Sequence, residues 1–228
     1  MTGARISILA IAIAVLAIGV TLAGISFFRP NTVADTHRYT RQVILHYTFS
    51  RADHPFIVLG DSITEASTLP RSVCDHALVN AGLDGASTAS DLGTWLNDVL
   101  EGRRAGAIVV ALGTNDALQG REQKEFETNY ASLLAQLKGA ADHLVVLGIP
   151  SVEVRGRMPA DYQAATMRRI DAFNAALPAL AEKAGAAFAP LPPMGAPHTI
   201  DGLHLDTAGY AVWDAAVLKG VSGACSTH

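Results

Sequence analysis

The stretch FIVLGDS, residues 56–62, decides the fold of this 228-residue chain. Its first four residues are apolar and rich in side chains that favour strands, so they predict a strand buried on both faces. Gly60 allows a sharp exit from that strand. Ser62 then falls at the start of the next helix, at the carboxyl edge of the predicted sheet.

Four more apolar runs repeat the pattern further along the chain. They lie at residues 77–79, 107–112 and 144–147, with a weaker one at residues 186–188. Glycine-containing turns follow the first three. Short runs that are apolar on both faces fit parallel strands covered by helices.

Helical patterns fill the gaps between these runs. One apolar stripe comprises Phe126, Tyr130, Leu133, Leu134 and Leu137, and a second comprises Ile170, Phe173, Leu177 and Leu180. Pro178 falls inside the second pattern and is expected to kink or divide that helix. Asp206 is expected to cap a final helix that carries Trp213.

Strands that alternate with helices predict an α/β fold: a three-layer α/β/α sandwich with a mostly parallel, doubly wound sheet. In such sheets ligands bind at the carboxyl ends of the strands. The polar residues that follow the strands are therefore the first place to look for chemistry.

A different segment precedes this domain. Ile6 to Phe28 are 23 consecutive positions without a charge or a proline. A helix of that length spans roughly 34 Å, enough for a hydrocarbon core of about 30 Å. We expect residues 1–28 to form an uncleaved signal anchor, a transmembrane helix. A cleaved signal peptide with Thr32-Val33-Ala34 at the cleavage site is the alternative, but its apolar region would normally be about 7–15 residues.

The charges around this segment give two indications of orientation. Arg5 precedes it, whereas Arg29, Arg38 and Arg41 follow it, which would place the domain in the cytoplasm. A short, positively charged N-terminus before an apolar run is, however, how export signals begin. We therefore expect a membrane-anchored domain outside the cytoplasmic membrane, or a secreted one if the signal is cleaved.

The remaining chain divides into two predicted parts. Residues 29–54 are expected to be a linker and a first amphipathic segment, and residues 55–228 the main domain. The apolar positions of that amphipathic segment are Val43, Ile44, Tyr47 and Phe49.

Composition excludes several classes of protein. The 17 Lys+Arg against 21 Asp+Glu give a net charge of -4, so we expect no nucleic-acid partner. A hydrophobic content of 50% argues against disorder. Two cysteines cannot form a disulfide framework or a Cys-rich zinc site. We expect Cys74 and Cys225 to be unpaired thiols, although an oxidising compartment would permit pairing.

Four polar motifs accompany the strands and the C-terminal helix. They are Gly60-Asp61-Ser62-Ile63-Thr64, the loop from Asn80 to Thr88, Gly113-Thr114-Asn115-Asp116, and Asp201-Gly202-Leu203-His204. Each has a purely structural explanation: a helix cap, glycine turns, an Asx turn, and a cap beside a surface histidine. An Asp and a His three residues apart can also bring a carboxylate against an imidazole.

Taken together, in this order and in this strand context, the motifs resemble the GDSL esterase/lipase family, the SGNH hydrolases. The resemblance covers roughly residues 55–218. Ile63 stands where the family name has leucine, at a position that supports packing. The resemblance implies an SGNH/flavodoxin-like fold and a serine hydrolase that cleaves carboxylic esters without a metal or cofactor.

The resemblance also implies roles for five residues. Ser62 corresponds to the nucleophile, His204 to its general base and Asp201 to the residue that orients the base. The oxyanion hole would comprise the Ser62 N–H, the Gly85 N–H and the Asn115 amide, with Gly82 as the less favoured alternative to Gly85.

The sequence is compatible with two other functions. The same site in an acyltransferase would move acyl groups to or from cell-envelope saccharides. A non-catalytic carbohydrate-binding module is a third possibility, which the intact site residues argue against. The substrate can be a small-molecule, saccharide or lipid ester. We expect His198 at the surface, with a place in the lining of the cleft as the alternative, and we assign no role to Glu65.

Overall fold

The computed structural model describes residues 32–153 and 159–226. The transmembrane helix expected at Ile6–Phe28 lies outside these residues. Across the described ranges, every helix falls short of the length or the apolar character needed to cross a bilayer.

Helix α2 (Val33–Phe49) is the first described element. Thr32 and Asp35 cap it reciprocally: the Asp35 N–H donates to Thr32 Oγ1 (3.1 Å), and the Thr32 N–H donates to Asp35 Oδ2 (3.0 Å). The chain divides into two compact units after Thr40, within α2, and the α/β unit begins at Arg41.

The part of α2 inside the α/β unit buries Leu45 and Phe49. Ile44 and Tyr47, which we expected on the apolar face, are 48% and 59% exposed. That prediction was wrong because the i, i+4 pair formed by Leu45 and Phe49, not the neighbouring positions, defines the buried face.

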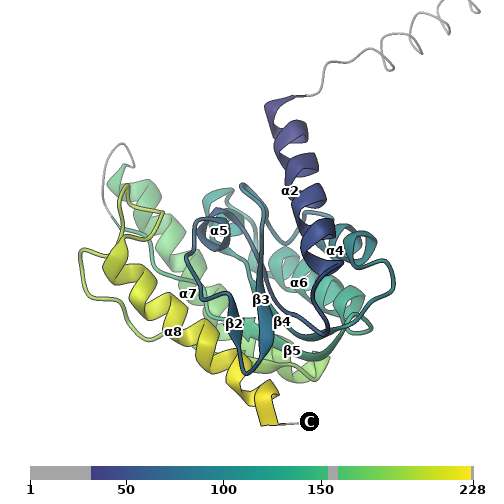
Figure 1. The fold of residues 1–228 in the computed structure, drawn as a ribbon. Coiled ribbons are helices and arrows are strands. Elements are labelled where there is room, and N and C mark those ends of the chain that lie inside the picture. The colour runs from purple at the N-terminus through teal and green to yellow at the C-terminus, as the bar shows by residue number, and fades with distance from the viewer. Residues whose placement is uncertain (1–31, 154–158, 227–228) are drawn as a thin grey trace, which may run out of the picture. The chain divides into compact units, whose positions relative to one another are not determined.

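Within the described residues, the sheet has six strands in the order β2-β3-β1-β4-β5-β6. Figure 1 shows the sheet with α8 (Thr207–Ser222) on one side and α4 (Leu92–Leu100) and α6 (Gln123–Leu137) on the other. Their bounds are β1 (Phe56–Gly60), β2 (Ser72–Val73), β3 (His76–Gly82), β4 (Ala105–Ala111), β5 (Ala141–Leu147) and β6 (Ala187–Ala189). All pairings are parallel except that between β2 and β3. The parallel strands follow the order 2-1-3-4-5 of a flavodoxin-like doubly wound sheet. The predicted strands and fold class are confirmed, and only the two-residue β2 was missed.

The register brings three strand ends to one level. Gly60 pairs with Gly82 on one side and with Ala111 on the other. The loops that follow β1, β3 and β4 therefore start side by side at the carboxyl edge, where the strand order reverses. That edge is where such sheets bind ligands.

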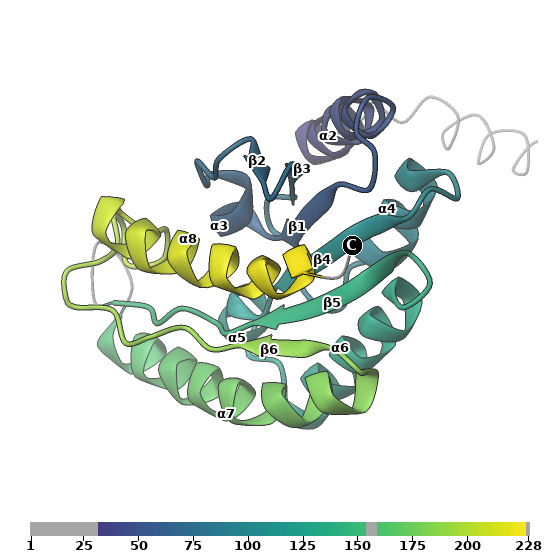
Figure 2. The same cartoon turned by 60° about the horizontal axis from the view of Figure 1, so that its bottom comes forward.

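Helices cover both faces of the sheet (Figure 2). The longer helices are α4 (Leu92–Leu100), α6 (Gln123–Leu137), α7 (Ala160–Ala184) and α8 (Thr207–Ser222); the short ones are α3 (Ser62–Glu65), α5 (Thr114–Leu118) and the 3₁₀ turn η1 (Gly223–Ser226). The C-terminal part of α2 packs with α4, α6 and α7 on one face. On the other face, α8 buries Trp213, Val217 and Val221.

The predicted helix features have mixed outcomes. Both apolar stripes are buried, and Asp206 caps α8 by accepting the N–H groups of Ala208 (2.9 Å) and Gly209 (3.0 Å). Helix α7, however, runs through Pro178 without dividing. Leu177 and Leu180, on either side of the proline, are both buried in the same core, and this packing outweighs the lost backbone hydrogen bond.

Cys74 and Cys225 form a disulfide across 151 residues of sequence. Our expectation of two free thiols was therefore wrong. Cys74 lies in the tight turn between β2 and β3, and Cys225 lies in η1, directly after α8. The contact between α8 and the β2–β3 hairpin brings the two together, and no local sequence pattern encodes that contact.

Candidate active site

The turn after β1 places Ser62 at the first position of α3. Asp61 caps this helix by accepting the Ile63 N–H at 3.0 Å. Gly60 has no room for a side chain, because an added Cβ would lie 2.0 Å from Thr64 Oγ1 and 2.7 Å from the Ala111 carbonyl oxygen. The glycine thus allows the strand and helix to meet closely, with Ser62 at the carboxyl edge of the sheet.

Ser62 and His204 come from opposite ends of the domain and meet at this edge. Ser62 Oγ lies 3.1 Å from His204 Nε2, and His204 Nδ1 lies 2.8 Å from Asp201 Oδ2. The three predicted residues therefore form one hydrogen-bonded line. The Asp201 and His204 side chains are 53% and 37% exposed, so the line is open to solvent on one side.

Asp201 is fixed by backbone donors as well as by the histidine ring. Its Oδ1 accepts the N–H of Leu203 (3.0 Å) and of His204 (2.8 Å). Burial acts to raise the Asp201 pKa, but the hydrogen bonds from the His204 ring and from the two N–H groups outweigh it and lower the pKa to about 2. Asp201 is therefore a carboxylate at neutral pH and can hold a proton on His204 Nδ1.

Asp61, directly before Ser62, is in the opposite electrostatic situation. The residue is 2% exposed, and burial raises its pKa to about 7 against the lowering effects of the Ile63 N–H and of His204. Ionisation of the Asp61 carboxyl group, directly before Ser62 in the chain, therefore costs free energy.

The loop after β3 carries Gly85 to the same edge. The Leu83 N–H donates to the Gly60 carbonyl (3.0 Å), and the Ala86 N–H closes a turn on the Leu83 carbonyl (3.0 Å). Gly85 lies inside this turn with φ +71°, in the left-handed region that suits glycine. The loop thus begins beside the turn that carries Ser62.

Asn115, in α5, reaches the loop from the other side. Its Nδ2 donates to the Ala86 carbonyl at 2.9 Å, which leaves the second amide N–H for another acceptor. The neighbouring Asp116 is fully buried and accepts hydrogen bonds from the Thr88 N–H (3.0 Å), Thr88 Oγ1 (2.6 Å) and Arg121 Nε (2.6 Å). These bonds hold the loops after β3 and β4 together.

His198 does not lie at the surface, as we had expected. It is 4% exposed, with its ring against Ser151 and Glu153 in the loop after β5. That prediction was wrong because the residues that bury it are more than forty positions away in sequence. Glu65, to which we assigned no role, accepts the Asp84 N–H next to Gly85.

Metal-binding side chains do not gather anywhere in residues 32–153 or 159–226: no group of three or more His, Cys, Asp or Glu there could hold an ion. The side chains that the structure does bring together at the sheet edge are a serine, a histidine and a carboxylate.

Comparison with known proteins identifies the family. The family model described as GDSL-like Lipase/Acylhydrolase family matches residues 58–212, a range that contains all five predicted site residues. No curated protein matches the chain.

Solved structures share the fold. A GDSL-like lipase from Bacteroides thetaiotaomicron is 18% identical, with a TM-score of 0.63 over 80% of this chain and 98% of that one. A lipase/acylhydrolase from Enterococcus faecalis is 19% identical, with a TM-score of 0.58 over 75% and 96%. Est24, a carbohydrate acetylesterase from Sinorhizobium meliloti, is 18% identical, with a TM-score of 0.59 over 75% and 99%.

The family match covers well over half of the chain. The chain therefore belongs to the GDSL-like lipase/acylhydrolase family, and it is an ester-hydrolysing enzyme.

Proposed function

We propose that the protein cleaves carboxylic esters through an acyl-enzyme on Ser62. The observation that carries this proposal is the continuous line from Asp201 through His204 to Ser62, with contacts of 2.8 and 3.1 Å. A serine hydroxyl is a weak nucleophile at neutral pH and needs a base to take its proton as it attacks. A histidine ring held in one tautomer by a carboxylate is such a base.

The reaction proceeds in two balanced halves. Ser62 Oγ attacks the ester carbonyl carbon while its proton passes to His204 Nε2; the imidazolium then protonates the leaving alcohol oxygen as the carbon–oxygen bond breaks. A water molecule next gives a proton to His204 Nε2 and attacks the acyl carbon. Collapse releases the carboxylic acid and returns the proton to Ser62 Oγ.

Each tetrahedral intermediate places negative charge on the former carbonyl oxygen. The Ser62 N–H, the Gly85 N–H and the free amide N–H of Asn115 are the proposed donors to it. Asp201 stabilises the imidazolium of His204, and its lowered pKa supports this role because it remains ionised throughout the neutral range. No step in this scheme needs a metal or an organic cofactor.

The substrate proposed for the first test is a short-chain ester. The acetylesterase activity named for Est24 makes acetyl esters a reasonable starting point. The purified full chain, given p-nitrophenyl acetate and longer p-nitrophenyl esters, is expected to release p-nitrophenol, whereas Ser62→Ala is not. Turnover by Ser62→Ala equal to that of the wild type would overturn the proposal. Transfer of the acyl group to an added sugar, in place of water, would identify an acyltransferase with the same site.

We further propose that the enzyme is anchored in the membrane by residues 1–28, with the domain outside the cytoplasmic membrane. The uncharged run from Ile6 to Phe28 supports the anchor, and the Cys74–Cys225 disulfide supports an oxidising compartment. The intact mass of the chain isolated from membranes should include residues 1–28. A mass that corresponds to a chain beginning at Asp35 would indicate that the signal is cleaved and that the enzyme is secreted.

A further inference from the structure

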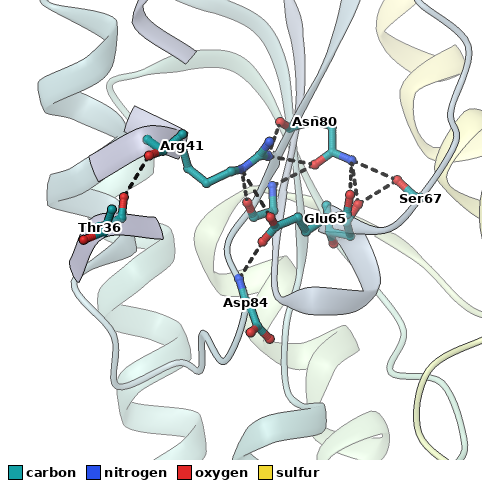
Figure 3. Close-up of polar contacts among 9 residues, drawn as sticks. Thr36, Arg41, Glu65, Ser67, Asn80 and Asp84 are labelled. Atoms are coloured by element: carbon teal, nitrogen blue, oxygen red, sulfur yellow. Dashed lines mark hydrogen bonds and ion pairs between the residues drawn. The ribbon is translucent and has the colours of Figure 1, made fainter. Parts of the chain in front are cut away.

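The Arg41 guanidinium joins α2 to the end of β3 (Figure 3). Its Nε donates to the Gly82 carbonyl at 3.0 Å, and its Nη2 donates to the Asn80 carbonyl at 2.9 Å and to Asn80 Oδ1 at 3.3 Å. The side chain is only 15% exposed. Arg41 thus binds two backbone carbonyls at the point where β3 passes into the loop that carries Gly85.

Glu65 holds the same loop from the other side. Its Oε2 accepts the Asp84 N–H at 2.8 Å, one residue before Gly85, and its Oε1 lies 3.8 Å from Arg41 Nε. Glu65 is also the last residue of α3, the helix that begins with Ser62. One carboxylate therefore links the helix that carries the nucleophile to the peptide next to the proposed oxyanion donor.

Asn80 completes the connection between the two elements. Its Nδ2 donates to the Thr64 carbonyl at 2.6 Å, and its Oδ1 accepts the Gly82 N–H at 2.9 Å. A Cβ on Gly82 would lie 2.2 Å from the Glu65 nitrogen, so the loop rests directly on α3. Because the space between Gly82 and Glu65 is this small, a displacement of Glu65 shifts the loop.

We propose that Arg41 and Glu65 are positioning residues that preset the Gly85 N–H for the oxyanion, an inference that rests on the proposed function. An oxyanion hole acts through donors that are already in place when the charge develops. The Arg41–Glu65 ion pair fixes the loop both at its base, through the carbonyls of Asn80 and Gly82, and next to Gly85, through the Asp84 N–H.

The test compares kinetics of the full chain with Arg41→Met and Glu65→Gln on p-nitrophenyl acetate. Arg41→Met is expected to lower kcat about tenfold, less than the 10²–10³ for outright loss of an oxyanion donor, with KM changed by about twofold at most. Glu65→Gln keeps an oxygen that accepts the Asp84 N–H, so its kcat should fall by a smaller factor than that of Arg41→Met. In the double variant, kcat should fall by less than the product of the two single reductions, because both residues act through one loop.

A transition-state analogue separates positioning from general stability. Phenylboronic acid forms a tetrahedral anion on a nucleophilic serine, so its Ki should rise by the same factor by which kcat falls, while KM stays nearly constant. A purely structural role would lower the folded fraction and change neither Ki nor the kcat of the folded enzyme, once active sites are counted with a fluorophosphonate.

Arg104 provides a matched control at the amino end of the sheet. It donates to the carbonyls of Gly139 (2.6 Å) and Ala141 (2.9 Å) and pairs with Asp142 (2.6 Å). Arg104→Met should lower the melting temperature and leave kcat and the boronate Ki unchanged. If Arg41→Met does not fold, Arg41→Lys and Glu65→Gln decide the question in the same assays.

The results that would overturn the positioning role differ from those that would overturn the proposed function. An inactive Ser62→Ala together with wild-type kcat and Ki in both Arg41→Lys and Glu65→Gln would overturn the positioning role alone. Full activity in Ser62→Ala would overturn the nucleophile assignment, and the positioning role with it.

Discussion

Among the described residues of this domain, a serine, a histidine and a carboxylate lie together in two places, and we propose catalysis at only one of them. In the first, Ser62 Oγ is 3.1 Å from His204 Nε2, and His204 Nδ1 is 2.8 Å from Asp201. In the second, Ser151 Oγ is 3.0 Å from His198 Nε2, and His198 Nδ1 is 3.3 Å from a Glu153 oxygen. Residue types and distances alone hardly separate the two groups.

The difference lies in what else the histidine nitrogens contact. His198 Nε2 is also 3.1 Å from the Ser151 carbonyl oxygen, which can only accept, so this nitrogen carries a proton and cannot take one from Ser151. His198 Nδ1 makes no hydrogen bond to any described residue, despite its nearness to Glu153. The His198 side chain is only 5% exposed, so it is closed to a substrate. A reactive serine needs an accepting nitrogen and access, not merely a nearby imidazole.

The second group instead supports the first. Glu153 Oε2 accepts the N–H groups of His198 (3.1 Å) and Thr199 (2.9 Å), and the Glu153 N–H donates to the Gly202 carbonyl (2.8 Å). These bonds hold the segment that leads into Asp201 and His204. We therefore expect chemistry at Ser62 and structural stabilisation around Glu153.

The largest expected effect separates the two serines. Ser62→Ala should lower kcat on p-nitrophenyl acetate at least about 10⁴-fold, because the acyl-enzyme can no longer form. Ser151→Ala should leave kcat within about threefold of wild type, as expected of a residue that does not touch substrate. Steady-state kinetics of both purified variants checks this, and a comparable loss in Ser151→Ala would break the distinction.

The second largest expected effect on kcat distinguishes the two carboxylates, Asp201 and Glu153. Asp201→Asn should lower kcat about 10³–10⁴-fold, somewhat less than loss of the serine, because the His204 tautomer is no longer fixed. Glu153→Gln should lower kcat less than about tenfold and act mainly on stability. Thermal unfolding measured beside the kinetics distinguishes these effects; a larger kcat loss in Glu153→Gln than in Asp201→Asn would reverse the assignment.

The proposed oxyanion donors also distinguish the Ser62 group from the Ser151 group, because we propose such donors only beside Ser62. Asn115→Ala should lower kcat about 10²–10³-fold with little change in KM. The boronate Ki should rise in parallel. Unchanged kinetics in Asn115→Ala would remove the side-chain donor from the proposed site.

The smallest expected effects concern stability and its dependence on pH. Burial raises the pKa of Asp61 from 3.8 to about 7. The protonated Asp61 therefore contributes to the free energy of unfolding below about pH 4, and this contribution is lost as the pH rises through 7. Asp61→Asn should therefore gain stability relative to wild type at pH 8, by about 1–3 kcal/mol, and little at pH 4.

Glu153 should behave in the opposite way. Burial acts to raise its pKa, but hydrogen bonds from Thr199 and the His198 N–H outweigh it and lower the pKa, so its contribution is present at neutral pH and is lost as pH falls below the usual glutamate range. Glu153→Gln should thus cost stability at pH 7 and less at pH 3. Urea unfolding across this range checks both variants, and parallel pH profiles would contradict the account.

The sequence predicts what depends on local patterns. The apolar run at residues 56–59 and its counterparts predict the parallel strands, because a strand buried on both faces needs a continuous apolar run. The family resemblance carried by the motifs around Ser62, Asn115 and His204 implies that these residues lie in one crevice. The fold class and the strand positions followed from these features.

What the sequence does not predict are contacts between distant elements. Cys74 and Cys225 pair because α8 packs against the β2–β3 hairpin, and His198 is buried because two loops meet. The sequence indicates Arg41 only as a charge that flanks the apolar segment, because no local pattern shows that α2 contacts the end of β3. Each of these depends on tertiary packing that single-sequence patterns do not encode.

The central claim is that Ser62, and not Ser151, is the reactive hydroxyl. Labelling the full chain with a fluorophosphonate and mapping the adduct by peptide mass spectrometry tests it most directly. The account predicts one adduct, on Ser62, that is absent from Ser62→Ala and retained in Ser151→Ala. An adduct on Ser151, or labelling that survives the Ser62→Ala substitution, would contradict it.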